Sequence, residues 1–298
     1  KIIMKIGKHR FDILDIFILI LMVVITIVTV YPFLNVLAIS FNDANDTVRG
    51  GLHIWPREFT LTNYKEIFSG SGNLKQGLIM SILRTVIGTA TGVIASAMVA
   101  FVLSKREFVF NKIITILFVL TMYISGGLIP EYMVIRELGL INHFSVYILP
   151  GLISAFNVIV IRSFIDGLPP ALNESAKVDG ANDFVIFFKI ILPLCLPVIA
   201  TVALFIAVGQ WNSWFDTYLY ARSNDSLTTL QYELMKVMDN AASSMADPNN
   251  PLAQSAAGVN PESIKMAITM VATVPILLVY PFVQKYFVSG MTLGAVKS

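Results

Sequence analysis

Long apolar runs alternate with polar segments along the 298 residues of this chain. An apolar run of about 18 or more residues is long enough to cross the hydrocarbon core of a bilayer as a helix. The pattern therefore predicts an all-α polytopic membrane protein whose residues 1–298 form a single transmembrane domain. Six runs reach this length and are the predicted transmembrane helices: Ile16–Phe33, Thr85–Ser104, Ile113–Pro130, Phe144–Ile161, Ile190–Trp211 and Met266–Gln284.

The composition agrees with a membrane protein. Hydrophobic residues make up 56% of the chain and charged residues 13%, whereas soluble domains carry about 25% charged residues. The net charge of +2 is too small to attract nucleic acid. The one cysteine, Cys195, lies in an apolar run, where we expect a small buried hydrophobic side chain.

Basic residues set the expected orientation. They are dense before the first apolar run, in the short segment after the second, and around the loop at residues 167–189. Because cytoplasmic segments carry the excess of Lys and Arg, we expect both termini and this loop in the cytoplasm. Residues 42–76 and 216–263 are then outer loops. The longer of these two loops either docks an extracellular binding protein or is a solvated connector.

One of the few polar stretches in this apolar chain is Asn173–Pro193, NESAKVDGANDFVIFFKIILP. Pro170 suits the first turn of a helix, where the missing N–H is not needed. Residues Leu172–Asp179 then predict a short helix that Gly180 ends, because glycine accepts a positive φ at this position. Asp183 is placed to cap the next helix, which continues into the fifth apolar run.

This spacing resembles the signature loop in the membrane subunits of binding-protein-dependent ABC importers. The pattern of that family is Glu-Ala-Ala, three residues, Gly, nine residues, Ile, one residue and Leu-Pro; the alternative is a chance amphipathic connector. Ser175 stands at the first alanine, and six positions fall in register: Glu174, Ala176, Gly180, Ile190, Leu192 and Pro193. Three further segments resemble the carbohydrate-uptake branch, in particular the maltose-type second permease of complex oligosaccharide importers: Gly126–Gly151, Val208–Asp216 and Tyr280–Ser298.

The resemblance implies a cytoplasmic coupling helix between the fourth and fifth transmembrane helices. It implies that Glu174 pairs with a basic residue of an ATPase and that small side chains permit close docking. The residues that it assigns to ATPase coupling are Glu174, Ser175, Ala176, Asp179 and Gly180.

The resemblance also implies the partners and the location. They are a second, different permease, two cytoplasmic ATPase subunits that bind ATP and Mg, and an extracellular solute-binding lipoprotein. The substrate is an oligosaccharide, and the chain lies in the lipid bilayer of the plasma membrane of a Gram-positive bacterium. No nucleic acid is expected as a partner.

Polar residues near or inside the apolar runs indicate a substrate path, because such groups are costly in lipid and face cavities. Amides and aromatic rings together suit sugars, which have polar rims and apolar C–H faces. Packing or an aromatic belt at the membrane interface is the alternative for both tryptophans. Arg84 either snorkels, pairs structurally, or pairs with an acidic group of a partner or of an acidic sugar. The candidate path residues are Asn157, Gln210, Trp211, Asn212 and Trp214.

Enzyme motifs are missing from the sequence. It contains no HExxH zinc helix and no Walker A loop, and its three histidines are scattered. We therefore expect no catalytic residue, metal site or cofactor in this chain, and a role as a permease subunit of an ATP-driven oligosaccharide importer. The alternative is an ion-coupled secondary transporter without an ATPase, which predicts inverted repeats and paired intramembrane carboxylates; neither is visible.

Overall fold

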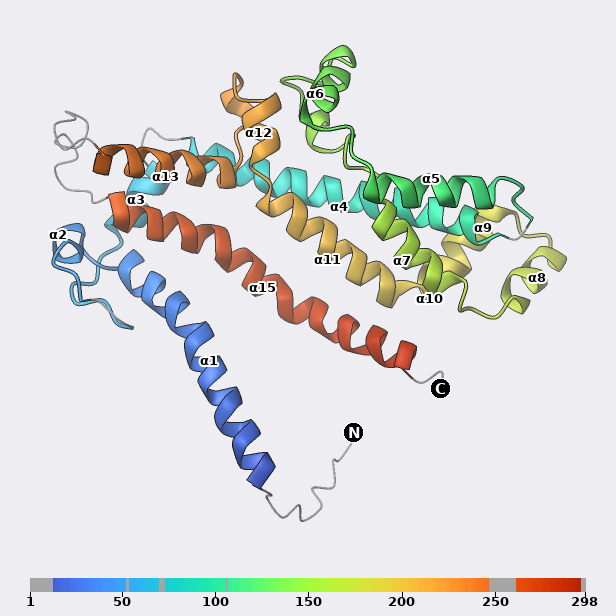
Figure 1. The fold of residues 1–298 in the computed structure, drawn as a ribbon, viewed down its shortest axis with the longest axis horizontal. Coiled ribbons are helices and arrows are strands. Elements are labelled where there is room, and N and C mark those ends of the chain that lie inside the picture. Colours follow the sequence, from blue (N-terminus) through green and yellow to red (C-terminus); the bar gives the residue numbers. More distant parts are fainter. Residues whose placement is uncertain (1–12, 52–53, 70–72, 106, 247–260, 296–298) are drawn as a thin grey trace. The chain divides into compact units, whose positions relative to one another are not determined.

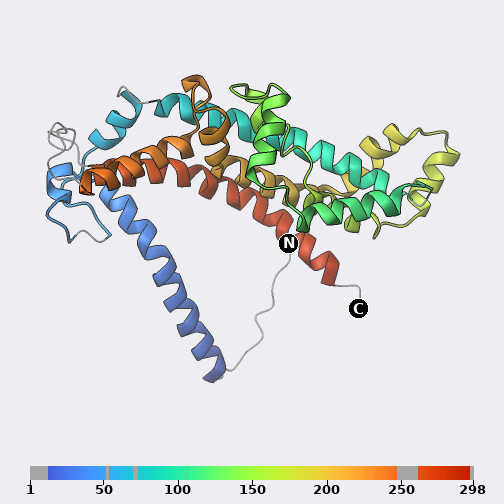
Figure 2. The same ribbon diagram turned by 45° about the horizontal axis from the view of Figure 1, so that its top comes forward.

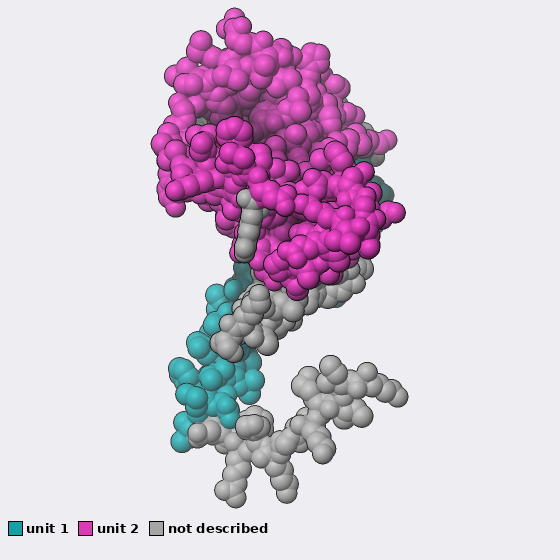
Figure 3. Space-filling model, turned by 90° about the vertical axis from the view of Figure 1, so that its right-hand side faces the viewer, with its two compact units in different colours: residues 1–70, 240–271 teal, residues 71–239, 272–298 magenta. Residues whose placement is uncertain are grey.

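The computed structural model describes residues 13–51, 54–69, 73–105, 107–246 and 261–295. Within these residues the chain is helical and has no strand, only an isolated bridge between Asn42 and Phe59. The all-α prediction is therefore confirmed. The helices form two compact units, Lys1–Gly70 with Asn240–Val271 and Ser71–Asp239 with Ala272–Ser298, which Figure 3 shows in two colours.

The first unit contains α1 (Ile13–Ser40), α2 (Ala44–Thr47) and α3 (Thr62–Ser69). Helix α1 is apolar all round, as expected of a membrane span. The segment after α1 is ordered around Asn42, which is fully buried. Its amide donates to the Asp46 carboxylate at 2.9 Å and accepts from the Glu58 N–H at 2.9 Å. The buried Asn42 side chain therefore links the segment around Asp46 to the segment around Glu58.

Three helices form the centre of the second unit: α4 (Leu74–Ser104), α7 (Ala155–Ile165) and α11 (Leu196–Asn212). Helix α4 packs along both α7 and α11, as Figures 1 and 2 show. Val158 and Val202 are fully buried in the apolar core between them. This core holds in place the polar residues described below.

Two predicted transmembrane helices are bent rather than straight. The run 113–130 is divided into α5 (Asn111–Tyr123) and α6 (Leu128–Glu137), which meet at 119°. The segment Asp183–Leu194 meets α11 at 84°. It contains α9 (Asp183–Ile186), the π-helix η2 (Phe187–Ile191) and α10 (Leu192–Leu194).

The run 144–161 is not one continuous helix, and its assignment as a membrane span stays a prediction. A 3₁₀ helix, η1 (Phe144–Tyr147), is followed by irregular chain up to α7, which has 11 residues. Pro150 lacks the N–H that a helix interior needs, and Gly151 follows it directly. The apolar run therefore contains a break that its hydropathy hides.

Among the described residues, three helices are long and apolar enough to cross a membrane, or up to five if each bent pair forms one span. The count of six stays a prediction, as does the single transmembrane domain. Residues 1–12 and 296–298, on which the expected orientation of the termini depends, lie outside the described part. The remaining elements are α8 (Ala171–Val178), α12 (Phe215–Tyr220), η3 (Asp225–Leu227), α13 (Leu230–Ala246) and α15 (Pro261–Ala295).

Candidate functional site

A cavity of about 380 Å³ lies in the second unit and is lined by residues of α4, α6, α7, α11 and α12 and of the segment around η1. We call it the central cavity. Two of the five predicted path residues line it, Asn157 from α7 and Gln210 from α11. Its other chemically active side chains are Arg84, Glu131, Tyr147 and Asp216.

Arg84 is a buried structural residue of the central cavity, with an exposed fraction of 2%. Its guanidinium donates to both carboxylate oxygens of Asp216, at 3.2 and 2.5 Å, and to the Ser213 carbonyl at 3.3 Å. The guanidinium carbon also lies 4.4 Å from the centroid of the Tyr147 ring. Of the alternatives for Arg84, structural pairing is therefore confirmed and snorkelling is wrong.

Gln210 is held in one orientation by two hydrogen bonds. Its carbonyl oxygen accepts from Arg84 Nε at 3.0 Å, and its amide nitrogen donates to the Tyr147 carbonyl at 3.0 Å. Gly88 of α4 makes room for this amide, because a Cβ at that position would lie 2.9 Å from it. A small residue on α4 therefore positions a polar residue on α11.

Asn157 lines the central cavity, and no hydrogen bond joins its side chain to another residue in the described part of the chain. The residue as a whole is 7% exposed, but its amide atoms are not among the fully buried polar atoms that lack a partner, so they are open to the cavity. The arrangement thus presents two donors and one acceptor to whatever fills the cavity.

The structure does not bring the other three predicted path residues to this cavity. Trp211 is 7% exposed, and its indole donates to the Ala272 carbonyl of α15 at 2.8 Å. Asn212 is exposed and accepts a hydrogen bond from Gln231 at 3.4 Å. Trp214 contacts the Tyr218 ring at a centroid distance of 6.3 Å. Packing, the alternative interpretation of Trp211, fits these contacts.

The predicted short helix is present as α8, and Gly180 has the expected positive φ of 81°. Glu174, Ser175 and Asp179 are exposed, so a partner can reach them. Ala176 is 6% exposed and packs in the core of this chain. Its small size serves internal packing in this chain, and its role in docking a partner stays a prediction.

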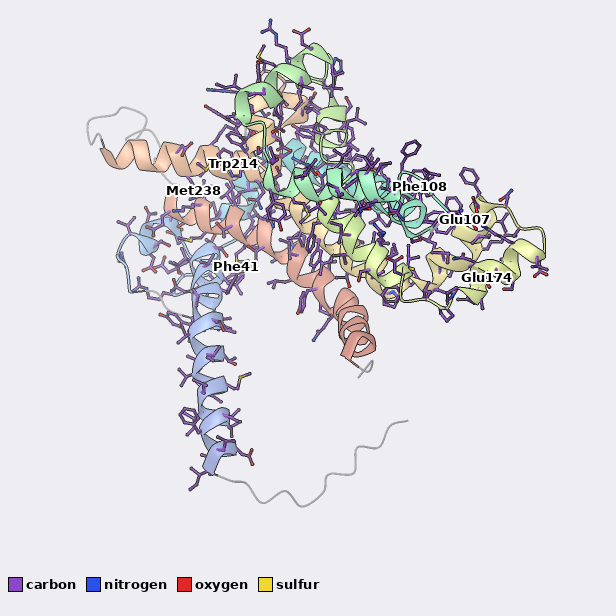
Figure 4. The ribbon with its side chains drawn as sticks, turned by 45° about the vertical axis from the view of Figure 1, so that its right-hand side comes forward. Phe41, Glu107, Phe108, Glu174, Trp214 and Met238 are labelled. Carbon is purple, nitrogen blue, oxygen red and sulfur yellow. The ribbon has the colours of Figure 1, made fainter. Side chains whose placement is uncertain are left out.

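Ion pairs connect α8 and α9 to the turn between α4 and α5. Lys177 Nζ lies 2.9 Å from the Glu107 carboxylate, and Lys105 pairs with Asp183. The hydrogen bond from Lys177 to Glu107 is the main reason that the pKa of Lys177 is raised. Figure 4 shows Glu107 and Glu174 at the same end of the unit, away from Trp214.

Between these elements lies a polar cavity of about 480 Å³, which we call the α8 cavity. Glu174 lines it, and so does Asn173, whose buried amide oxygen has no hydrogen-bond partner among the described residues. Sequence reasoning missed Lys105 and Glu107, since no local spacing links residue 107 to residue 177. No group of His, Cys, Asp or Glu side chains that would hold a metal ion occurs among the described residues.

Comparisons with known proteins show the protein family to which this chain belongs. Residues 2–293 match the family described as "Binding-protein-dependent transport system inner membrane component". The chain is 40% identical over 273 residues to the polygalacturonan/rhamnogalacturonan transport system permease protein YtcP of Bacillus subtilis (strain 168), covering 91% of this chain and 93% of that protein. It is 41% identical over 272 residues to protein LplC of the same organism, covering 91% and 90%.

A solved structure has the same fold along nearly the whole chain. It is a chain of a bacterial ABC transporter involved in the import of the acidic polysaccharide alginate, with a TM-score of 0.83 and 26% sequence identity. The match covers 94% of this chain and 99% of that one. This chain therefore belongs to the family of inner membrane components of binding-protein-dependent transport systems, and it is a membrane-embedded permease subunit.

Proposed function

We propose that this permease is one of two different permease subunits in an ATP-driven oligosaccharide importer, and that its central cavity lies on the sugar path. The observation that carries the proposal is the Asn157 amide, which lines that cavity inside an otherwise apolar helix and is open to a ligand there. Relatives named as permeases for polygalacturonan and arabinooligosaccharides support a sugar as the substrate.

The chemistry of the central cavity fits one sugar ring of a longer chain. Its volume of about 380 Å³ lies in the range of about 300–1,000 Å³ that is usual for small-molecule sites. Asn157 supplies hydrogen-bond donors and an acceptor for hydroxyl groups, while Gln210 and Arg84 fix the opposite wall. Apolar lining from Val146 and Ile206 suits the C–H face of a sugar.

The exposed residues of α8 are proposed to couple the permease to its ATPases. Glu174 offers a carboxylate beside a polar cavity that is wide enough to admit a basic side chain. The ion pairs Lys177–Glu107 and Lys105–Asp183 then make α4 and α5 move together with α8. ATP and Mg are bound by the ATPase subunits, whose closure moves the attached helices as rigid bodies.

The complete proposal also includes the partners and the orientation. A second permease, two ATPases and an extracellular solute-binding lipoprotein complete the complex in the plasma membrane of a Gram-positive bacterium. The termini and α8 face the cytoplasm, where the ATPases are. The family match supports a binding-protein-dependent importer rather than the alternative, an ion-coupled secondary transporter.

The test is reconstitution of the full complex in vesicles with the variants Asn157→Leu and Glu174→Gln. We expect Asn157→Leu to raise the half-saturating sugar concentration while ATP hydrolysis without sugar stays unchanged. Glu174→Gln should lower both uptake and stimulated ATP hydrolysis. The matched control is Glu137→Gln, an exposed residue outside both cavities. Unaltered uptake by Asn157→Leu would remove the central cavity from the sugar path, and uptake without ATP would refute the importer.

A further inference from the structure

The charges of the central cavity are unequal. Its lining contains one guanidinium, Arg84, and two carboxylates, Glu131 and Asp216. The electrostatic character of the site depends on which of these groups is free to meet a ligand. If Glu131 were neutralised by another group, the cavity would carry no net charge; if it is not, the cavity carries a net negative charge.

Arg84 is not free. Its guanidinium is 2% exposed, and its hydrogen bonds go to Gln210, Ser213 and both oxygens of Asp216. The Tyr147 ring lies against it as well. A ligand carboxylate would have to displace several of these contacts in order to reach the cation. The guanidinium therefore neutralises Asp216 and leaves no positive charge for the cavity.

The Glu131 carboxylate, by comparison, has no neutralising cation. It is exposed on α6, forms no ion pair with any residue in the described ranges, and has the Tyr220 hydroxyl as a hydrogen-bonding neighbour. Tyr220 is a buried residue of the cavity wall. Burial is the main cause that raises its pKa, and the charges of Glu131 and Asp216 and the hydrogen bond with Glu131 act in the same direction. Because Arg84 is paired with Asp216, Glu131 leaves the charged groups of the lining with a net negative charge.

We infer that the central cavity selects an uncharged, hydroxyl-bearing part of the sugar and repels carboxylates, so that an acidic sugar binds with its carboxylate turned away from Glu131. This inference rests on the proposed function. The Glu131 carboxylate accepts hydrogen bonds from hydroxyl groups, and the Asn157 amide both donates and accepts. A uronate carboxylate beside Glu131 is a like-charge contact, which discriminates against that binding pose.

The first test measures the sign of the potential without any sugar. Gly151 lines the central cavity and has open space where a Cβ would lie, so Gly151→Cys introduces a reporter thiol. The native Cys195, which is 1% exposed, is replaced by Ala. In the intact complex, a cationic and an anionic methanethiosulfonate are compared for their rates of modification. Relative to a free thiol in solution, we expect a preference for the cationic reagent of about tenfold.

Glu131→Gln should reduce this preference, and the matched exposed control Glu137→Gln should not. Equal or faster reaction with the anionic reagent would overturn the inference. Failure of both reagents to react would overturn it too, since a cavity on an aqueous path must admit them. These outcomes do not depend on transport, so they stand even if the proposed function fails.

The second test uses two probes of the same shape, trigalacturonate and its fully methyl-esterified form. In vesicles containing the full complex, Glu131→Gln should raise uptake of the acid relative to the ester by up to about fivefold, as expected for loss of one partly solvated charge contact. Glu137→Gln should leave the ratio unchanged. If both probes are transported and Glu131→Gln does not alter their ratio, the assigned selectivity is wrong. If the complex transports no sugar, the proposed function fails and the thiol measurement alone decides the sign of the potential.

Discussion

The guanidinium of Arg84 on α4 and the carboxylate of Asp216 on α12 form a two-point ion pair, with N–O distances of 3.2 and 2.5 Å. The residues are 132 positions apart in the sequence. The exposed fraction is 2% for the Arg84 side chain and 22% for that of Asp216. If one partner is removed, water can therefore solvate the remaining Asp216 carboxylate far better than it can solvate the remaining Arg84 guanidinium.

This difference predicts unequal effects of removing each partner. Asp216→Asn leaves a buried guanidinium without its counter-charge and should lower the free energy of unfolding by about 2–3 kcal/mol. Arg84→Met leaves a carboxylate that water can reach and should cost less. Denaturant unfolding in detergent measures both values. A larger loss for Arg84→Met than for Asp216→Asn would contradict this account of the pair.

A second prediction concerns Gly88, which makes room for Gln210. Gly88→Ala places a methyl group 2.9 Å from an amide that is tied to Arg84 and Tyr147. Overpacking of this kind costs about 1–3 kcal/mol, and the displaced Gln210 should also weaken sugar uptake. The control is Gly92→Ala, where the new Cβ meets the mobile end of Ile206 at 3.3 Å. Equal stability and equal uptake for the two variants would show that Gln210 is not held as described.

The pair Lys177–Glu107 predicts a charge-reversal effect on coupling. Both side chains are largely exposed, at 43% and 80%, and such pairs contribute only about 0–1 kcal/mol to stability. Glu107→Lys places like charges together, so stimulated ATP hydrolysis should fall while the amount of folded permease stays the same. The double variant Glu107→Lys with Lys177→Glu should recover it. No recovery in the double variant would mean that the pair itself has no role in coupling.

A pH dependence follows from Asp46 in the loop after α1. The hydrogen bond from Asn42 is the main cause that lowers its pKa below the ordinary value of 3.8, with Arg57 acting in the same direction. A lowered pKa stabilises the folded loop above the ordinary pKa, and this stabilisation is lost as the pH falls through the lowered value. The protection factors for hydrogen exchange of residues 42–51 and 54–60, which correct for the pH dependence of intrinsic amide exchange, should therefore fall on acidification below about pH 4 in the wild type.

The variant Asp46→Asn isolates the contribution of this carboxylate. It should already exchange faster at pH 5 than the wild type, and the difference between the two proteins should shrink as the pH falls. The variant Asp43→Asn provides a neighbouring carboxylate as control. If the difference between wild type and Asp46→Asn does not change with pH, other carboxylates control the loop.

Local chemistry explains what could be predicted from the sequence. The ends of α8 follow from Pro170 and Gly180, because a proline and a positive-φ glycine act within a few residues. One neighbouring detail was wrong, since the cap of α9 is Asn182, which accepts from the Val185 N–H at 2.9 Å, and not Asp183. Two adjacent polar residues fit the cap equally well, and only the backbone geometry separates them.

Contacts between distant segments explain what could not be predicted. Helix α11 is apolar on all sides, so no periodicity shows that Gln210 faces the central cavity while Trp211 faces α15. Asn157 lines the central cavity, as expected of a polar group in an apolar run, while its place on the substrate path stays a prediction. The structural role of Arg84 could not be predicted, because its ion-pair partner Asp216 lies 132 residues away in the sequence and no local pattern connects the two.

The most direct test of the sugar path is a structure of the full complex, trapped with an ATP analogue and oligogalacturonate. The account predicts a sugar ring in the central cavity, with a hydroxyl within hydrogen-bond distance of the Asn157 amide and the uronate carboxylate turned away from Glu131. A sugar chain bound entirely outside the cavity, with the Asn157 amide paired to a protein group of the partner permease, would contradict it.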